Sequence, residues 1–214
     1  MKQESVIPAA AAAENPMHAR ILGAAFKAFM EHGYAGTSTL DIARRAKVSK
    51  RDLYANFGSK HQMLTACIKG RADRMRLRPN LPSLRTRQIL EATLTAFAAK
   101  WLREISDPPV IATFRLAIAE ATGSPEIAQA LDTAGRNAIR GVLAELLANA
   151  QSAGLIGAGE PTQMATQFLG LVWEDLMVGL LLGVAKRPRP IEAERRAAKA
   201  TAVFLQLHPS PSAA

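Results

Sequence analysis

The chain has 214 residues, of which 49% are hydrophobic, so it can bury a substantial core without disulfides or metal. Its single cysteine, Cys67, excludes an internal disulfide framework and a cysteine-based zinc site, and suits a reducing cytoplasm. The net charge of +9 is uneven: residues 1–80 hold 14 Lys and Arg against 6 Asp and Glu, whereas residues 81–214 hold 13 against 12. Positive charge concentrated in the first third indicates a polyanionic partner, either nucleic acid or an anionic membrane, although a merely basic soluble surface is the alternative.

Neither a secretory signal nor a membrane span is expected at the sequence level. Residues 1–14 lack the basic and long apolar regions of a signal peptide, and the longest uncharged apolar run, 176–185, is too short to cross a bilayer. We expect residues 1–15 to form a disordered tail and residues 208–214 a frayed one. The sequence therefore predicts a cytoplasmic, bacterial protein with no membrane partner.

Helix-start signals divide the remaining chain into about nine helices. Asn15-Pro16 opens the first, and Ser38, Ser49 and Ser59 each stand three residues before a carboxylate or amide, the spacing of a capping box. Prolines at 108, 125, 161 and 190 suit the first turns of later helices. The expected helices cover residues 16–32, 38–46, 49–57, 59–77, 84–106, 108–122, 125–153, 161–185 and 190–207. No stretch shows sustained strand-like alternation, so we expect an all-α fold.

The second and third expected helices are short and are separated by only Lys47-Val48. Ala43, Ala46 and Leu53 have the small or apolar character that a close crossing of two short helices needs. This arrangement predicts a helix-turn-helix, in which the second helix lies in the major groove of DNA.

The segment from Ile21 to Lys60 closely resembles the DNA-binding domain of the tetracycline-repressor (TetR) family, within it the AcrR-like group. The matching stretches are Gly33-Tyr34-Ala35-Gly36-Thr37-Ser38, Asp41-Ile42-Ala43, Val48-Ser49-Lys50 and Leu53-Tyr54-Ala55-Asn56-Phe57-Gly58-Ser59-Lys60. The resemblance implies a helix-turn-helix domain over residues 16–62 and a helical ligand-binding and dimerisation domain over residues 63–207. It also implies a sequence-specific transcriptional regulator, usually a repressor that a small molecule releases from its operator.

The resemblance and the residue chemistry together suggest which side chains contact DNA. The second helix starts where hydroxyls and backbone N–H groups can bind a phosphate. The first turn of the recognition helix can reach base edges, and the two-pronged guanidinium of Arg51 suits guanine. The predicted contact residues are Thr37, Ser38, Lys47, Ser49, Lys50, Arg51, Asp52, Tyr54, Asn56 and Lys60.

Several of these residues also have a purely structural interpretation. The serines suffice as helix caps, and Asp52 serves more readily as the capping-box carboxylate than as a cytosine reader. Tyr54 can be half-buried with its hydroxyl in water. Lys47 stands where the family commonly has glycine, and lysine there costs roughly 1 kcal/mol if the backbone is left-handed. Asp52 and Ala55 also depart from the family's usual residues.

The C-terminal helices are expected to form the dimer and the ligand site. The resemblance implies that helices 161–185 and 190–207 pair with their mates in a homodimer, and the first of them is apolar nearly all round. A central core helix of a monomer is the alternative. The family's pocket lies among helices from about residue 84 to 185, where the candidate lining residues are Phe97, Trp101, Phe114, Arg115, Glu120 and Trp173. The scarcity of polar groups there favours a small, mainly hydrophobic effector.

Other classes of function have less support in the sequence. No nucleophile motif, phosphate-binding glycine loop or metal-ligand spacing of histidines occurs, so we expect neither an enzyme nor a cofactor or metal. Cys67 is interpreted as a small core residue. The alternative function is a helical partner- or ligand-binding protein with a degenerate DNA head, for which Lys47 and Asp52 are the support. A basic peripheral membrane protein is a further alternative, but it would carry its charge along one long amphipathic helix.

Overall fold

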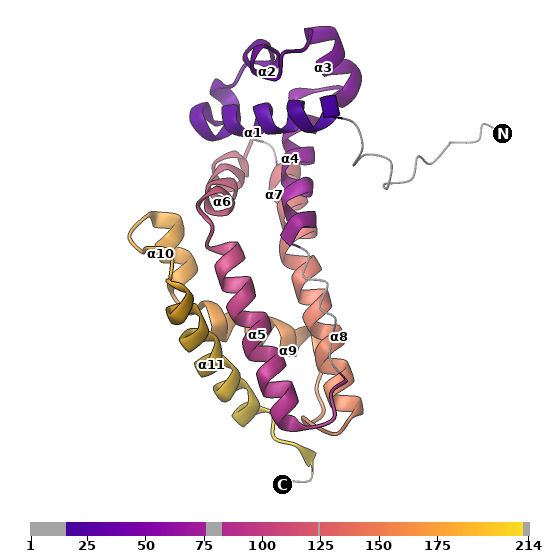
Figure 1. The fold of residues 1–214 in the computed structure, drawn as a ribbon, viewed down its shortest axis with the longest axis vertical. Coiled ribbons are helices and arrows are strands. Elements are labelled where there is room, and N and C mark those ends of the chain that lie inside the picture. The colour runs from indigo at the N-terminus through magenta and orange to yellow at the C-terminus, as the bar shows by residue number, and fades with distance from the viewer. Residues whose placement is uncertain (1–15, 76–82, 124, 212–214) are drawn as a thin grey trace, which may run out of the picture.

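The computed structural model describes residues 16–75, 83–123 and 125–211, and every regular element in these ranges is a helix (Figure 1). The expected all-α fold is therefore confirmed. The predictions for the N-terminal tail, for the linker at 78–82, for the last two residues of helix 59–77 and for residues 212–214 lie outside these ranges.

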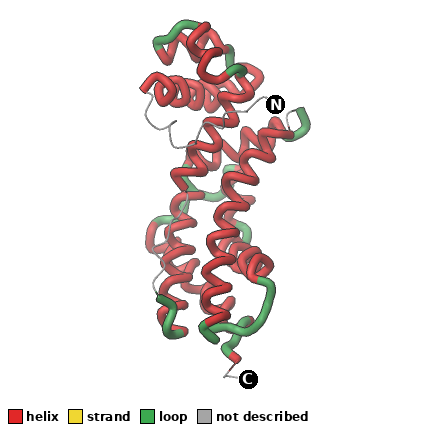
Figure 2. The backbone as a smooth tube through the Cα atoms, turned by 90° about the vertical axis from the view of Figure 1, so that its right-hand side faces the viewer, coloured by secondary structure: helices red, strands yellow, loops and turns green. Residues whose placement is uncertain are grey.

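Four helices make up the N-terminal part, with α1–α3 forming a compact head at one end of an elongated molecule (Figures 1 and 2). The first three, α1 to α3, pack their buried side chains into one core with the start of the fourth, α4. Gly33 interrupts the first helix with φ 70°, which a glycine adopts without steric cost. The four are α1 (Pro16–Gly36), α2 (Thr39–Ala46), α3 (Lys50–Phe57) and α4 (Lys60–Met75).

The C-terminal part is an elongated helical bundle beneath the head (Figure 2). Within it α11 packs against α5 and α9, and α8 packs against α9. The elements are α5 (Arg87–Ile105), α6 (Pro108–Glu120), α7 (Pro125–Leu131), the π-helical segment η2 (Asp132–Asn137), α8 (Ala138–Ser152), α9 (Pro161–Trp173), α10 (Leu176–Leu182) and α11 (Pro190–Leu207).

The helix-start signals in the sequence are confirmed at residue level. The backbone N–H groups of Asp41, Asp52 and Gln62 each donate to the serine three residues earlier, at 3.1, 3.0 and 3.1 Å. The helices α1, α6, α7, α9 and α11 all begin at a proline. Both devices act on the first turn, where backbone N–H groups lack partners within the helix, so they can be recognised without knowledge of the tertiary fold.

The helix expected over 125–153 contains a π-helical segment at Asp132–Asn137. The Asn137 Nδ2 donates to Asp132 Oδ2 at 2.9 Å, and the Arg136 Nε lies 3.0 Å from Asp132 Oδ1. The wider turn brings side chains five residues apart together, which the Asp132–Asn137 pair uses. Gly135, a weak helix former, lies in the middle of this segment.

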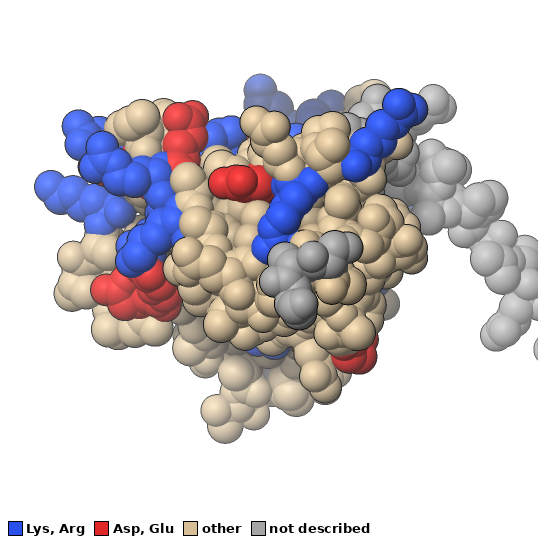
Figure 3. Space-filling view, turned by 90° about the horizontal axis from the view of Figure 1, so that it is seen from below, with Lys and Arg blue, Asp and Glu red and all other residues tan. Residues whose placement is uncertain are grey.

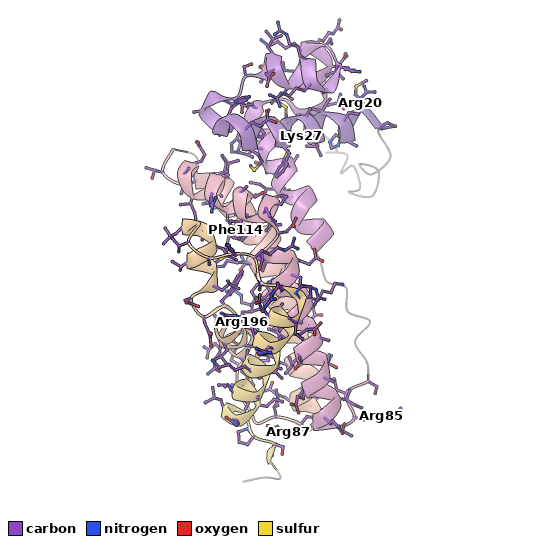
Figure 4. The ribbon with its side chains drawn as sticks, turned by 60° about the vertical axis from the view of Figure 1, so that its left-hand side comes forward. Arg20, Lys27, Arg85, Arg87, Phe114 and Arg196 are labelled. Atoms are coloured by element: carbon purple, nitrogen blue, oxygen red, sulfur yellow. The ribbon has the colours of Figure 1, made fainter. Side chains whose placement is uncertain are left out.

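The prediction of one helix over 161–185 is wrong, because the chain breaks at Glu174 and continues as α10 after a bend of 59°. Glu174 has φ 44°, and its carboxylate pairs with Arg196 at 3.0 Å and Lys199 at 3.3 Å, both on α11. Arg196 also donates to the Trp173 carbonyl at 3.1 Å (Figure 4). These contacts with α11 give the Trp173 carbonyl and the Glu174 carboxylate their partners, and they thereby favour the break in the helix at Glu174.

No single helix among the described residues is long and apolar enough to cross a membrane. The bent pair of α9 and α10 reaches the necessary length and composition only when the two helices are taken together.

The guanidinium of Arg87 joins the start of α5 to two segments that are distant in the sequence. From the first turn of α5 it donates to the carbonyls of Leu155 at 2.6 Å and His208 at 3.3 Å, and to that of Leu205. These acceptors lie in the loop after α8 and at the end of α11, so one guanidinium satisfies carbonyls from two distant segments. Arg85, two residues earlier, is exposed (Figure 4).

Replacing Arg87 by Gln should lower the free energy of unfolding by about 2 kcal/mol, because hydrogen bonds from a charged donor are lost and carbonyls are left without partners. Urea denaturation followed by circular dichroism measures this difference. Arg85→Gln is the matched control and should change stability by less than about 0.5 kcal/mol. Equal effects of both substitutions would contradict the assigned role of Arg87.

Candidate functional site

The turn between α2 and α3 has the geometry of a helix-turn-helix. Lys47 ends α2 in the left-handed region, with φ 52° and ψ 49°. Its N–H donates to the Arg44 carbonyl at 3.1 Å, and the Val48 N–H donates to the Ala43 carbonyl at 3.0 Å. The left-handed conformation considered for Lys47 from the sequence is therefore present, and the turn directs α3 away from α2.

The first turn of α3 is fixed by a reciprocal capping box. The Asp52 N–H donates to Ser49 Oγ, and the Ser49 N–H donates to Asp52 Oδ2 at 3.3 Å. Leu53 and Phe57 anchor the opposite face of the helix in the core of the head. The box leaves Lys50 and Arg51 exposed beside the helix N-terminus, where a phosphate or a base edge can approach.

Tyr54 lies on the exposed side between α2 and α3. Its side chain is 40% exposed, and its hydroxyl oxygen is 3.2 Å from Thr39 Oγ1. Lys50 Nζ lies 5.9 Å from the centre of the Tyr54 ring. The hydroxyl is thus held beside the start of α2 while the ring remains open to solvent.

Three predicted contact residues point inward. The Thr37 side chain is 3% exposed, and its hydroxyl is 3.0 Å from the Ala28 carbonyl and 2.6 Å from that of Gly33. The Lys60 ammonium donates to the Tyr34 carbonyl at 2.8 Å and to the Thr37 carbonyl at 3.1 Å. Asn56 donates to the Asp52 carbonyl within its own helix at 2.8 Å. Burial and inward hydrogen bonds occupy the Thr37 hydroxyl, so this geometry favours a role within the head over the expected contact with a phosphate.

The exposed cations of the head differ in how far they are neutralised. Arg45 pairs with Glu31 at 2.6 Å and with Asp41 at 2.8 Å, and the hydrogen bond with Glu31 raises the pKa of Arg45 above its ordinary value. Lys47 and Arg51, in contrast, have no ion-pair partner among the described residues. Arg20 and Lys27, both on α1 (Figure 4), and also Arg44 and Lys50, are exposed and likewise have no ion-pair partner among the described residues. The head therefore carries a net positive surface around the turn and the recognition helix, as a polyanionic partner requires.

The opposite end of the molecule also carries basic side chains, but acidic side chains lie among them. Figure 3 looks at this end and shows Lys and Arg gathered on the side where α10 and α11 lie, with acidic side chains among them. Before and within the first turn of α11, Arg189 pairs with Glu192 at 2.7 Å, and Arg187 pairs with Asp107 at 2.9 Å. Residues 81–214 hold 13 Lys and Arg against 12 Asp and Glu, so the unbalanced charge belongs to the N-terminal part.

A cavity of about 510 Å³ lies in the C-terminal part and is bounded by α5, α6, η2, α8, α9 and α10. Its size is within the range of sites for small organic molecules. Trp101 and Trp173 meet edge to face in its wall, with ring centres 4.7 Å apart. The other lining residues are mainly apolar, among them Ile105, Phe114, Ile118, Ile139, Val142, Leu169, Met177 and Leu181.

Three of the six ligand candidates line this cavity, namely Trp101, Phe114 and Trp173. Phe97 is buried in the core of the C-terminal part. Arg115 instead donates to the carbonyls of Leu180 and Leu181, both at 2.8 Å, and thereby caps α10. Glu120, at the end of α6, is partly buried and also lies outside the lining.

Two basic residues of the cavity wall, Arg136 and Arg140, were not among the ligand-site residues predicted from the sequence. The signal that drew attention to Arg115, a charge within an otherwise apolar helix, was equally present for Arg140 in α8. Arg136 belongs to the π-helical segment, whose altered turn changes which side chains face inward, and helical periodicity does not reveal that change.

The cavity and the head share helix α6. Phe114 and Ile118 on this helix line the cavity, whereas Leu116 and Ala117 belong to the core of the head. In addition α4 packs against α7 and η2, and Ile127 of α7 is fully buried in the head's core. A ligand that moves the cavity wall therefore acts on helices that touch the DNA-binding part directly.

Two family profiles match the chain. Residues 21–67 match the profile of bacterial regulatory proteins of the tetR family, and residues 92–208 match that of the C-terminal domain of AefR-like transcriptional repressors. The second match alone covers more than half of the chain. The chain belongs to the TetR family. This TetR-family protein is a DNA-binding transcriptional regulator and not an enzyme, which confirms those two predictions.

Solved structures give the same fold. A TetR-family regulator from Mesorhizobium loti shares 24% sequence identity with a TM-score of 0.78, over 91% of this chain and 99% of that one. A TetR regulator from Agrobacterium tumefaciens shares 26% identity with a TM-score of 0.77, over 92% and 96% of the two chains. The flavonoid-responsive regulator FrrA shares 26% identity with a TM-score of 0.76, over 90% and 96%. A comparison with curated protein sequences finds no match.

Replacing Lys47 by Gly should raise the free energy of unfolding by about 0.5–1 kcal/mol, because it removes the left-handed strain of a side-chain-bearing residue. The same substitution at Lys69, exposed within α4, should instead lower it by about 1 kcal/mol. Denaturant titrations of both variants measure these opposite signs. If Lys47→Gly lost as much stability as Lys69→Gly, position 47 would not carry strain.

Proposed function

We propose that this regulator is a homodimeric repressor that binds an operator through two copies of α3 and leaves it when a small, mainly apolar molecule fills the cavity. The observation that carries the proposal is the sharing of α6 between the cavity and the core of the head. Repression is further supported by the matched C-terminal profile, which describes transcriptional repressors.

The DNA interface of the proposal consists of the exposed cations around the turn and the first turn of α3. Lys47, Lys50 and Arg51 can neutralise phosphates, and Arg51 is the residue we assign to guanine recognition. The N-terminus of α2, which Ser38 caps, and the hydroxyl of Tyr54 would bind the phosphate backbone of the DNA. Lys60, Asn56 and Asp52 would contribute by holding the head in shape.

The second copy of the chain would pack on α9, α10 and α11. The outer face of α11 presents the exposed apolar residues Ile191, Ala198 and Ala202 at helical spacing, with the exposed Arg195 among them. Small side chains permit a partner helix to approach closely. Exposed apolar residues continue onto α10, where Leu182 is 71% exposed, and into the following loop, where Val184 is 81% exposed. Exposed apolar side chains gathered on neighbouring elements support an interaction site here.

In the proposed switch, an effector would displace Phe114 and Ile118 and thereby shift α6 against α1. Since packed interiors do not deform continuously, such a shift would re-orient the head as a unit. The two recognition helices of the dimer would then no longer fit successive major grooves. The degenerate-head alternative loses its support, because the turn is intact with Lys47 in it and Asp52 forms the capping box of α3.

Fluorescence anisotropy with DNA from upstream of the protein's own gene, and with a shuffled control, tests the DNA-binding half of the proposal. Binding to the native DNA should be tighter by roughly 10³-fold or more, with a steep dependence on salt. Arg51→Ala should cost roughly 10-fold or more and reduce the preference for native over shuffled DNA. Tyr54→Phe, which removes only a hydroxyl, should weaken binding to both DNAs alike.

Arg85→Ala, at the opposite end of the molecule, is the matched control and should leave both affinities and the salt dependence unchanged. If the operator lies elsewhere in the genome, selection from a random DNA library would still reveal the preferred sequence. If neither the native DNA nor the library yields a preferred sequence, the repressor proposal is wrong.

Ala202→Glu should convert the dimer to a monomer, because it places a charge on the apolar face of α11. Light scattering after size-exclusion chromatography measures the mass, and circular dichroism checks that the helix content is kept. Ala92→Glu makes the same change at an exposed position on α5 and should leave the dimer intact. A dimer that survives Ala202→Glu would place the interface elsewhere.

A further inference from the structure

The wall of the cavity carries positive charge without an acidic residue. Arg136 and Arg140 are among the lining residues, and no aspartate or glutamate is. Arg136 is neutralised from outside the lining, since its Nε lies 3.0 Å from Asp132 Oδ1. Arg140 is partly buried, and no carboxylate among the described residues pairs with it.

The one described partner of Arg140 is a neutral group that holds it in place. Its Nη2 donates to Asn137 Oδ1, and the Asn137 amide in turn donates to Asp132 Oδ2 at 2.9 Å. The guanidinium is thus oriented through the π-helical segment but keeps its charge and its remaining N–H donors. A partly desolvated cation that lacks a counter-charge is unfavourable, and an anion placed against it would be bound strongly.

We infer that the effector is an apolar carboxylic acid, whose carboxylate pairs with Arg140 while its hydrophobic body occupies the rest of the cavity. The planar guanidinium matches a carboxylate in geometry as well as in charge. The body would lie along Trp101, Phe114, Trp173 and Met177, which supply an apolar surface. This inference rests on the proposed function, because it takes the cavity to be the effector site.

Thr166, which is exposed, contributes the one side-chain hydroxyl among the described lining residues. It can hydrogen-bond a ligand but does not distinguish an acid from its amide. Arg136 is exposed and already paired, so it adds little to the preference for an anion. The selection of an acid over a neutral analogue therefore depends on Arg140.

A displacement assay with the uncharged fluorophore N-phenyl-1-naphthylamine tests the inference on the full-length protein. The competitors are decanoate and decanamide, which have the same hydrocarbon chain and differ in the charge of the head. At pH 7.5 decanoate should displace the fluorophore at a concentration at least 10-fold lower than decanamide. Arg140→Gln should abolish this preference by weakening decanoate alone, whereas Arg136→Gln should retain most of it.

Occupation of the cavity is tested separately. A Cβ at Gly170 would meet no atom within 4 Å, so Gly170→Phe can fill the cavity, and this variant should no longer bind the fluorophore. If the wild type failed to bind it, or Gly170→Phe bound it normally, the cavity would not be the effector site and both proposals would fall. If the fluorophore bound as expected but the two competitors were equal, or Arg140→Gln weakened both alike, only the carboxylic-acid inference would be overturned.

Discussion

The two-sided packing of α6 is the constraint on which the rest of this structure depends. Leu116 and Ala117 help to complete the core of the head, and neighbouring positions Phe114 and Ile118 form part of the cavity wall. Ile118 is 59% exposed, so this part of the wall keeps room to move, whereas Ala117 is 3% exposed. A helix that serves two cores cannot shift in one without disturbing the other, since both are close-packed. The α6 position therefore couples the shape of the cavity to the placement of the DNA-binding head.

Arginines that cap the ends of other helices hold these helices in defined positions. Arg87 binds carbonyls near the ends of α8 and α11, Arg115 binds those at the end of α10, and Arg196 binds that of Trp173 at the end of α9. Each guanidinium spans at least two elements, which backbone capping within one helix cannot do. Trp173 and Leu181 both line the cavity, so two of these arginines hold its wall at defined points. Arg115 itself belongs to α6, so a shift of α6 would carry the end of α10 with it.

Much of the fold could be predicted from the sequence because its signals are local. Serine caps and first-turn prolines act within three or four residues, and they placed the starts of α2, α3, α9 and α11 to within one residue. The break at Glu174 could not be predicted, because it is supported by Arg196, which is far away in sequence and comes close only after α11 has folded back. The direction of side chains raised the same difficulty. Thr37 belongs to the recognisable motif, yet its hydroxyl bonds inward to Ala28.

The candidate ligand site, too, could be predicted only in part from the sequence. Trp101, Phe114 and Trp173 could be selected because aromatic residues in apolar helices commonly line pockets. Arg115 and Arg140 were indistinguishable as sequence, since each is an isolated cation in an apolar helix. Only tertiary contacts separate them: carbonyls of α10 satisfy Arg115, whereas a neutral amide leaves Arg140 charged toward the cavity. Whether a polar group in a core is structural or functional depends on its partners, which periodicity does not contain.

Release from DNA further restricts which contacts of an effector can matter. To weaken operator binding 100-fold, the ligand must bind the released state about 100-fold more tightly than the DNA-bound one, a difference of about 2.7 kcal/mol. Contacts that are equal in both states contribute affinity but no switching. In the proposed switch, an ion pair with Arg140, which lies on α8 outside the core of the head, would be of this kind and would select the ligand. The differential energy must come from the walls that move with the head, of which α6 with Phe114 and Ile118 is the direct one. In the proposed switch, recognition and switching would thus be carried by different walls of one cavity, so a ligand with the right acid and too short a body would bind without inducing release.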